Sequence, residues 1–196
     1  MARHYLIVND LSNAPRDVAF VDVSTDAPPQ TPITVQIEVL VPDPQTGQLP
    51  PPMQVALQNG FGRSATFRVV SNGLLRIDTP MPFAATLHQR SNNGKLVIAS
   101  VDPARAAGRA FFAAVGDGGS AHILVGNPQD VPANVRLAID SLQAQPFATA
   151  TIPPLSAAKF AVPLLQRNVC IASDVDVLAQ LAVDIIRVDV APLLPL

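Results

Sequence analysis

The sequence predicts an all-β protein made of two β-sandwich modules in tandem, of the jelly-roll or immunoglobulin-like kind. Short apolar runs alternate with polar residues at the period of a half-buried strand. Twenty prolines interrupt these runs, so that turn residues recur at the spacing of about 8–12 residues typical of sandwiches and barrels. Segments of the first half also match segments of the second half in the same order, which predicts an internal duplication.

The first module is expected over residues 1–102. Its clearest strand is Ile33–Val39, where every odd position is apolar and every even position is polar. Runs of this kind predict strands at 18–23, 33–41, 54–58, 65–70, 74–78, 83–89 and 95–100. A proline-rich insertion at 42–52 interrupts the pattern, and its consecutive Pro50, Pro51 and Pro52 predict a stiff, extended arm.

The second module is expected over residues 103–196, with strands at 110–115, 122–125, 135–139, 148–152, 159–162 and 177–190. The alanine-rich stretch Pro103–Ala114 is interpreted as the connector into this module, beginning with a helical turn. The chain ends in an apolar tail, whereas chain ends are usually polar and frayed. The tail is therefore expected to pack into a groove on its own module or on a neighbouring subunit.

Three pairs of segments carry the predicted duplication. They are Tyr5–Asp10 with His122–Asn127, Ala65–Val69 with Ala158–Val162, and Phe83–Leu87 with Val177–Leu181. In the first pair, each copy reads as a strand, a polar turn, a proline and a second strand. Chance similarity between short β patterns is the alternative, and three matches in one order make it less favoured.

The composition points toward protein partners. Charged residues make up 14% of the chain and the net charge is −2, so no basic field for nucleic acid is expected. Aromatic residues make up 5% and tryptophan is absent, which disfavours stacking of bases or sugars. A surface with so few charges is typical of one covered by neighbouring copies or partners. We therefore expect a homo-oligomer or a subunit of a larger assembly.

Compartment signals are sparse. The N-terminal apolar run is too short for a signal-peptide core, and no run of 18 apolar residues predicts a transmembrane helix. We expect synthesis in the cytoplasm without a signal peptide and incorporation into a particle or virion as one destination. Cys170, the only cysteine, lies in an apolar run and is expected to be a buried thiol.

The second half contains motifs of a known kind. Phe111–Gly116 (FFAAVG), Ile123–Pro128 (ILVGNP) with Pro132–Val135 (PANV), and Ile152–Ser156 (IPPLS) look like the pattern "FFAEG…LLVxNP…PAxV…VPPxS". In these motifs the chain resembles small bacterial β-sandwich domains of the sensory rhodopsin transducer type. The resemblance covers about residues 110–190 and implies a sandwich that works by binding or assembly rather than by catalysis. Ala114 stands where that pattern usually has Glu, so a role of that carboxylate is not carried over.

Motifs that suggest chemistry have simpler interpretations. Gly60–Ala65 fits GxGxxA, but the following residues are β-like, so a glycine hairpin is favoured over a dinucleotide site. Asp117–Ser120 reads as a turn, because no acidic residue follows at calcium-loop spacing. Asp174 and Asp176 lie on one face of a strand but are typical of a polar sandwich edge. The histidines are scattered at positions 4, 88 and 122, without metal-ligand spacing.

The leading hypothesis is a non-enzymatic assembly protein that acts through exposed surfaces. Its expected contact residues are Pro50, Pro51, Pro52, Pro192, Leu193, Leu194 and Leu196. No catalytic residue, cofactor or metal is predicted. The first alternative is a ligand-binding or signalling adaptor, as the family resemblance suggests, and the second is an enzyme that joins His88 or His122 to two aspartates.

Overall fold

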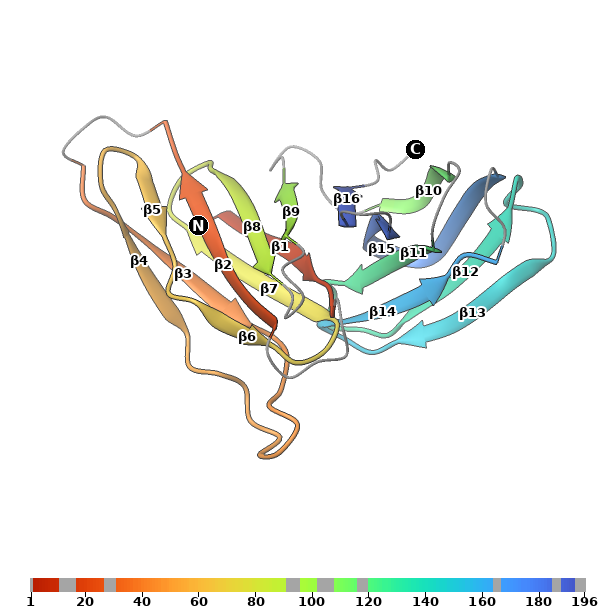
Figure 1. Ribbon diagram of the computed structural model, residues 1–196, viewed down its shortest axis with the longest axis horizontal. Helices are drawn as coiled ribbons and strands as arrows, with labels where there is room; N and C mark the ends of the chain where they lie inside the picture. Colours follow the sequence, from red (N-terminus) through yellow and green to blue (C-terminus); the bar gives the residue numbers. More distant parts are fainter. Residues whose placement is uncertain are drawn as a thin grey trace. The chain divides into compact units, whose positions relative to one another are not determined.

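The computed structural model describes residues 2–10, 17–26, 31–90, 96–101, 108–115, 120–163, 167–184 and 188–192. Within these ranges the chain is all-β and contains no helix, which confirms the predicted class. The chain divides into two compact units, Met1–Ala104 and Arg105–Leu196, here called unit 1 and unit 2. Figure 1 labels the strands of both.

Unit 1 contains two antiparallel sheets. The first has the order β1-β7-β3-β4 and consists of β1 (Ala2–Val8), β7 (Gly73–Thr79), β3 (Ile33–Val39) and β4 (Met53–Leu57). The second has the order β5-β2-β8-β9 and consists of β5 (Phe61–Arg63), β2 (Asp17–Ser24), β8 (Ala84–Arg90) and β9 (Leu96–Val101), with β6 (Phe67–Val69) also paired to β2.

The two sheets of unit 1 bury their apolar faces. Along β3 the odd positions from Ile33 to Val39 are buried and the even ones are not, as the alternation predicts. The sheets meet where the His4 ring of β1 packs edge-on against Phe83, with 4.8 Å between ring centroids. They are also joined by Asn9 and Gln89, because the Gln89 amide accepts from the backbone N–H of Asn9 (3.1 Å) and donates to its carbonyl (2.7 Å).

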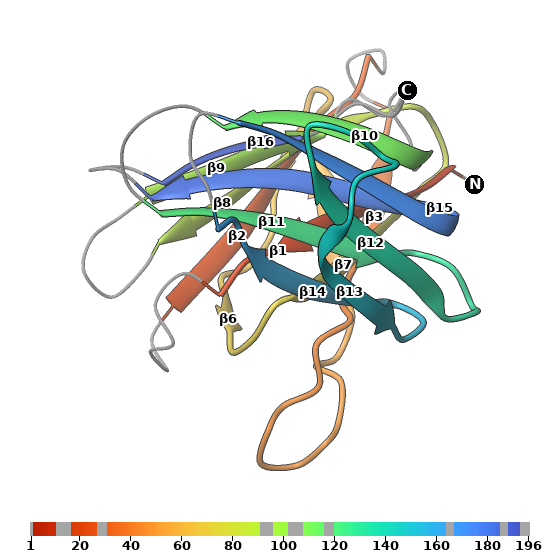
Figure 2. The same ribbon diagram turned by 90° about the vertical axis from the view of Figure 1, so that its right-hand side faces the viewer.

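The described residues of unit 2 form seven strands, which all belong to one hydrogen-bonded network. They are β10 (Gly108–Val115), β11 (Ser120–Asn127), β12 (Ala133–Ile139), β13 (Pro146–Ile152), β14 (Ser156–Ala161), β15 (Arg167–Asp184) and β16 (Val188–Pro192). Strand β15, the long blue strand in Figure 2, joins two layers. Its first half pairs with β10 and β12, and its second half pairs with β11 and β16.

The core of unit 2 lies between these layers. Phe111, Leu137 and Ile171 come from the layer of β10, β12 and the first half of β15, while Ile123 and Ala179 come from the other layer. All five side chains belong to one buried cluster. Unit 2 is therefore a sandwich in which one strand contributes to both sheets.

The two units share one strand order. Strand β15 takes part in both sheets of unit 2, so each of its halves counts as one strand. In the first sheet the order β10-β15-β12-β13 matches the order β1-β7-β3-β4 of unit 1. In the second sheet the order β14-β11-β15-β16 matches β6-β2-β8-β9, with β5 beside β6 on the same edge of β2. The first half of β15 thus takes the place of β7, and its second half that of β8. The shared order extends over both sheets of each unit.

Equivalent residues mark the point where the chain crosses between the sheets. In unit 1 the Thr79 hydroxyl accepts from the backbone N–H of Met81 at 3.3 Å. In unit 2 the Ser173 hydroxyl accepts from the N–H of Val175 at 3.4 Å. Each hydroxyl thus bonds the N–H two residues later, a local turn that competes with a regular ladder.

The shared strand order agrees with two of the three sequence matches. In this order β6 of unit 1 occupies the same place as β14 of unit 2, and β8 occupies the same place as the second half of β15. The sequence matches at 65–69 and 83–87 give the same two equivalences. The shared strand order gives a different equivalence for Tyr5–Asp10, because β1 corresponds to β10 and β11 occupies the place of β2. That segment pair was matched by its strand–turn–proline pattern, which recurs at different positions in a sandwich.

Several predicted boundaries were wrong. The predicted strand at 110–115 forms part of β10 (Gly108–Val115), so the predicted connector Pro103–Ala114 overlaps this strand from Gly108 onward, and residues 103–107 lie outside the described part. Residues 167–176 belong to β15 although no strand was expected there. The polar Ser173, Asp174 and Asp176 hid this strand, because they sit where it leaves one sheet for the other.

The Gly60 motif is a hairpin turn followed by a strand. Asn59 and Gly60 both have positive φ, 52° and 78°, as an Asn-Gly turn of type I′ requires. A side chain at Gly60 would begin 2.6 Å from the Thr25 carbonyl oxygen, and one at Gly62 would begin 2.7 Å from Leu57. These glycines serve close backbone approach in a hairpin, and no helix follows for a dinucleotide.

Asn127 closes the turns at one end of unit 2. Its side chain is fully buried and donates to the carbonyls of Val131 (2.8 Å), Ile152 (3.0 Å) and Pro153 (3.1 Å). Its carbonyl oxygen accepts from the N–H of Gln129 at 3.0 Å. One amide therefore satisfies backbone groups of two proline-containing turns, which explains why an Asn-Pro and a Pro-Pro motif occur together.

We expect Asn127→Ala to lower the free energy of unfolding by about 2–4 kcal/mol, because buried backbone groups lose their partners. Chemical denaturation followed by circular dichroism measures the change. Asn168→Ala, at an exposed position of β15, is the matched control and should alter stability by less than about 0.5 kcal/mol. Equal effects of the two substitutions would contradict the role of Asn127.

Candidate functional site

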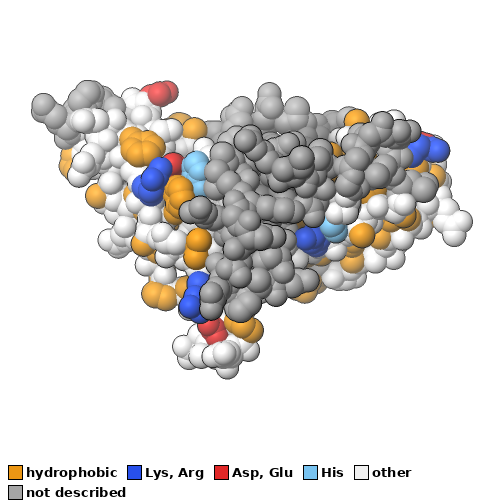
Figure 3. Space-filling model, in the orientation of Figure 1, with side chains coloured by type: hydrophobic (Ala, Val, Ile, Leu, Met, Phe, Trp, Pro, Cys, Tyr) orange, Lys and Arg blue, Asp and Glu red, His pale blue; other side chains and the backbone are white. Residues whose placement is uncertain are grey.

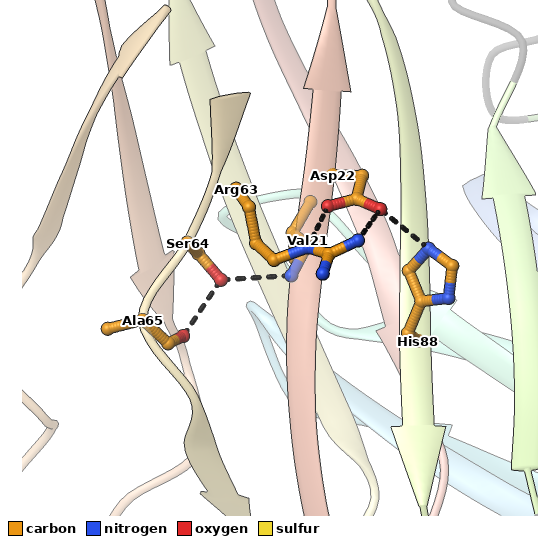
Figure 4. Close-up of polar contacts among 6 residues, drawn as sticks. All are labelled: Val21, Asp22, Arg63, Ser64, Ala65 and His88. Atoms are coloured by element: carbon orange, nitrogen blue, oxygen red, sulfur yellow. Dashed lines mark hydrogen bonds and ion pairs between the residues drawn. The ribbon is translucent and has the colours of Figure 1, made fainter. Parts of the chain in front are cut away.

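A compact polar cluster lies across three strands of unit 1, with its side chains on the solvent side of β2. Figure 4 shows Asp22 of β2 between Arg63 of β5 and His88 of β8. Arg63 donates to both carboxylate oxygens of Asp22, at 2.6 Å and 2.9 Å. The His88 Nε2 atom lies 3.1 Å from one of them. Figure 3 shows charged, histidine and hydrophobic side chains gathered over this part of unit 1.

Phe20 completes the cluster from the same face of β2, two residues before Asp22. The Arg63 guanidinium lies 4.4 Å from the centroid of its ring, and the His88 ring stacks against it at 4.6 Å with an angle of 9° between the planes. The phenyl ring therefore packs against a cation and an imidazole. It is poorly placed to serve as a platform for a base or a sugar.

The electrostatics of the cluster are those of a structural ion pair. Two hydrogen bonds from Arg63 hold the pKa of Asp22 below its ordinary range against the opposing effect of burial, and His88 adds to the lowering. The carboxylate thus stays ionised and already has a bidentate partner. Such a carboxylate fixes three strands together, and it is less suited to orient His88 as a base.

The nearest hydroxyl in this group is also engaged. Ser64 accepts from the backbone N–H of Val21 at 2.9 Å and donates to the carbonyl of Ala65 at 2.8 Å. It lies between β5 and β6, where the pairing with β2 is interrupted. Its side chain replaces a missing ladder bond, as Figure 4 shows, and is not directed at His88.

The predicted carboxylate pair, Asp174 and Asp176, has separate partners. Asp174 accepts from the backbone N–H and the side-chain amide of Asn134, at 2.8 Å and 2.7 Å. Asp176 accepts from Arg109 at 3.2 Å. Both lie where β15 passes between its two sheets, and they hold the crossing strand to its neighbours.

Other residues considered for chemistry are also buried or paired. Cys170 is fully buried, and burial raises the pKa of its thiol, which disfavours the nucleophilic thiolate. Burial lowers the pKa of His4. Of the basic residues of the first module, Arg63 pairs with Asp22 and Arg76 pairs with Glu38 at 2.6 Å.

The part of the chain that the structure describes shows neither a cluster of metal ligands nor a helix that could span a membrane. No three His, Cys, Asp or Glu side chains in the described ranges come together as metal ligands. Among the same residues there is no helix with the length and apolarity needed to cross a bilayer. Asp117–Ser120 includes residues 117–119, which lie outside the described part.

The predicted contact residues fall into two groups. Pro50, Pro51 and Pro52 belong to the connection between β3 and β4, and every residue from 42 to 52 is exposed. This proline arm (residues 42–52) extends away from β3 and β4 as an orange loop in Figures 1 and 2. Of the predicted C-terminal contact residues, Pro192 ends β16, opposite Gln180, and Leu193, Leu194 and Leu196 lie outside the described residues.

An edge strand that the sequence did not single out is a further candidate. Strand β13 ends its sheet and pairs with β12 only among the described strands. Its seven residues, Pro146–Ile152, carry no charge. Natural edge strands are usually protected by charges, prolines or bulges. Here Pro146 and a β-bulge at Phe147 protect the start of the strand, and Ala148–Ile152 carries none of these features.

No family model matches the chain, and neither a curated protein nor a solved structure matches it. The resemblance to transducer-type domains therefore stays a prediction.

We expect Arg63→Met to raise the pKa of Asp22 toward its ordinary value of 3.8, because the carboxylate loses its bidentate donor. Carbon-13 titration of the carboxyl groups measures this shift. Asp174, whose pKa is lowered by Asn134, is the internal control and should not move.

The same pair gives a pH dependence of defined sign. Because the pKa of Asp22 is lower in the folded state than in the unfolded chain, its ionised form stabilises the folded protein at pH values above the unfolded pKa. This stabilisation is lost as the pH falls through the folded pKa. The stability difference between the wild type and Arg63→Met should therefore shrink in acid. A difference that stays constant from neutral pH to about pH 2 would show that the ion pair does not contribute.

Proposed function

We propose that this protein is a non-enzymatic assembly subunit that joins other copies of itself through sheet edges, as in a particle, filament or smaller oligomer. The observation that carries this proposal is the uncharged edge strand β13. An unprotected strand edge presents backbone N–H and C=O groups that another strand can pair with. A second copy offers the same edge, so two β13 strands related by a twofold axis would continue one antiparallel sheet.

Two further features support this role. Charged residues are only 14% of the chain, which leaves few charges to repel a neighbouring copy. The carboxylates of Asp22, Asp174 and Asp176 each bond a residue of a neighbouring strand. They therefore stabilise the fold. Edge pairing requires none of them.

We expect purified wild-type protein to have a mass above the 20.6 kDa of one chain in light scattering at high micromolar concentration. Thr149→Lys should weaken association by roughly tenfold or more, a change of about 1.4 kcal/mol, because it places a charge on the exposed face of β13. A monodisperse wild-type monomer would contradict the proposal.

Thr34→Lys provides the matched control for this experiment. Thr34 is also exposed, but it lies on β3, which sits between β7 and β4. The same change of charge is thus made on an internal strand, and it should leave the mass unchanged. If both substitutions reduced association equally, a general effect of charge would replace the edge contact as the explanation.

One observation favours ligand binding as a second candidate function. A shallow hollow of about 280 Å³ lies beside the end of β2 and the start of β8 and is lined by Ser24, Thr25, Asp26, Pro82, Phe83 and Ala84. It combines an aromatic wall with polar groups, as small-molecule sites do. A thermal-shift panel of small polar ligands tests it, and Asp26→Asn should abolish any stabilisation that depends on this hollow.

We also propose that the two units arose by duplication of one β-sandwich, because they share a strand order and the same hydroxyl turn at the sheet crossing. If so, each unit contains a complete fold. We expect residues 105–196, expressed alone, to unfold cooperatively in urea with the β-type circular dichroism of the full chain. A fragment without a cooperative transition would argue against two independent copies.

A further inference from the structure

We propose that the proline arm is a ligand for an aromatic-lined groove on a different protein, which it enters as a polyproline II helix. This site is separate from β13 and involves another class of partner.

The arm is longer than the fold requires. Strand β3 ends at Val39 and β4 begins at Met53, so residues 40–52 connect them. In unit 2 the corresponding strands, β12 and β13, are connected by residues 140–145, about half that length. The same hairpin thus closes without a protruding arm, and long loops beyond the needs of a fold are usually functional.

Covalent geometry fixes the conformation of the arm around its three prolines. Each proline has φ near −65°, and each residue before a proline is restricted to the β or polyproline II region. Leu49, Pro50 and Pro51 all precede a proline, and no peptide bond among the described residues is cis. These constraints together specify a left-handed polyproline II turn of three residues.

The first half of the arm, residues 43–48, forms a turn held by hydrogen bonds within the arm. The Asp43 carboxylate accepts from the N–H groups of Gln45 (2.8 Å) and Thr46 (3.0 Å). The backbone of Asp43 bonds Gln48 and Gly47 at 2.8 Å and 2.7 Å. The arm is therefore ordered before it binds, which reduces the entropy lost on association.

The exposed chemistry of the arm defines its partner. Leu49 is 53% exposed and the three prolines that follow it are exposed. The single charged residue of the arm is Asp43, and its carboxylate already accepts hydrogen bonds from the turn at Gln45 and Thr46. Exposed proline-rich helices of this kind dock into grooves lined by aromatic side chains. This chain has one tyrosine, no tryptophan and eight phenylalanines. The exposed phenylalanines, Phe61 and Phe112, lie in different units, so a second copy is a poor source of such a groove.

The absence of tryptophan also provides a clean measurement. We would titrate the full-length protein into a panel of SH3, WW and EVH1 domains, each with a tryptophan in its groove, and follow the fluorescence of that tryptophan. We expect saturable binding to at least one domain. No response from any domain at about 1 mM protein, the limit of weak recognition, would overturn the proposal.

Two variants identify the arm as the binding segment. Replacing Pro50, Pro51 and Pro52 together by alanine should weaken binding by roughly tenfold or more, because the helix is no longer fixed. Val131→Ser removes a similarly exposed apolar side chain in unit 2, 47% exposed, and should leave binding unchanged. Equal binding by the wild type and the triple variant would overturn the proposal.

A separate readout distinguishes this inference from the proposed assembly function. The triple-alanine variant should keep the oligomeric mass of the wild type, whereas Thr149→Lys should keep the binding of the groove domains. Loss of assembly in the triple variant would assign the arm to contacts between copies and would overturn its assignment to a different protein.

Discussion

Burial of one apolar face from every sheet against a second sheet is the interaction on which the structure depends. Strands such as β3 alternate strictly between buried and outward positions, so each sheet has a face that water disfavours. A single sheet cannot cover that face, and two sheets cover each other. In unit 2 the apolar faces of both layers are buried in one continuous cluster of side chains.

A sandwich requires the chain to change sheets, and the two units solve this in related ways. Unit 1 separates β7 from β8 by Pro80 and Pro82, which cannot donate to a ladder. Unit 2 keeps one long strand, β15, and holds its unpaired middle with Asp174 and Asp176. In both, a hydroxyl, from Thr79 or Ser173, bonds the second N–H that follows. The polar residues at these places secure backbone groups that the sheets leave unpaired.

Other polar side chains also replace missing ladder bonds. Ser64 bonds Val21 where β5 and β6 are interrupted, Gln89 bonds the end of β1, and Asn127 closes two turns. Each is buried, and a buried backbone group without a partner is costly. This use of polar residues explains why a chain with few charges nevertheless has specific polar clusters.

The sequence by itself determined the all-β class, the burial of alternate residues in β3 and the presence of an exposed, stiff segment at Pro50–Pro52. These follow from local rules, namely the period of two in a strand and the fixed φ of proline. Only the tertiary structure decided that Asp174 and Asp176 hold a strand crossing, that Tyr5–Asp10 does not correspond to His122–Asn127, and that β13 ends a sheet. The physical reason is that strand partners are chosen by contacts between residues distant in sequence, and a periodic pattern shows which face is buried but not which strand lies beside it.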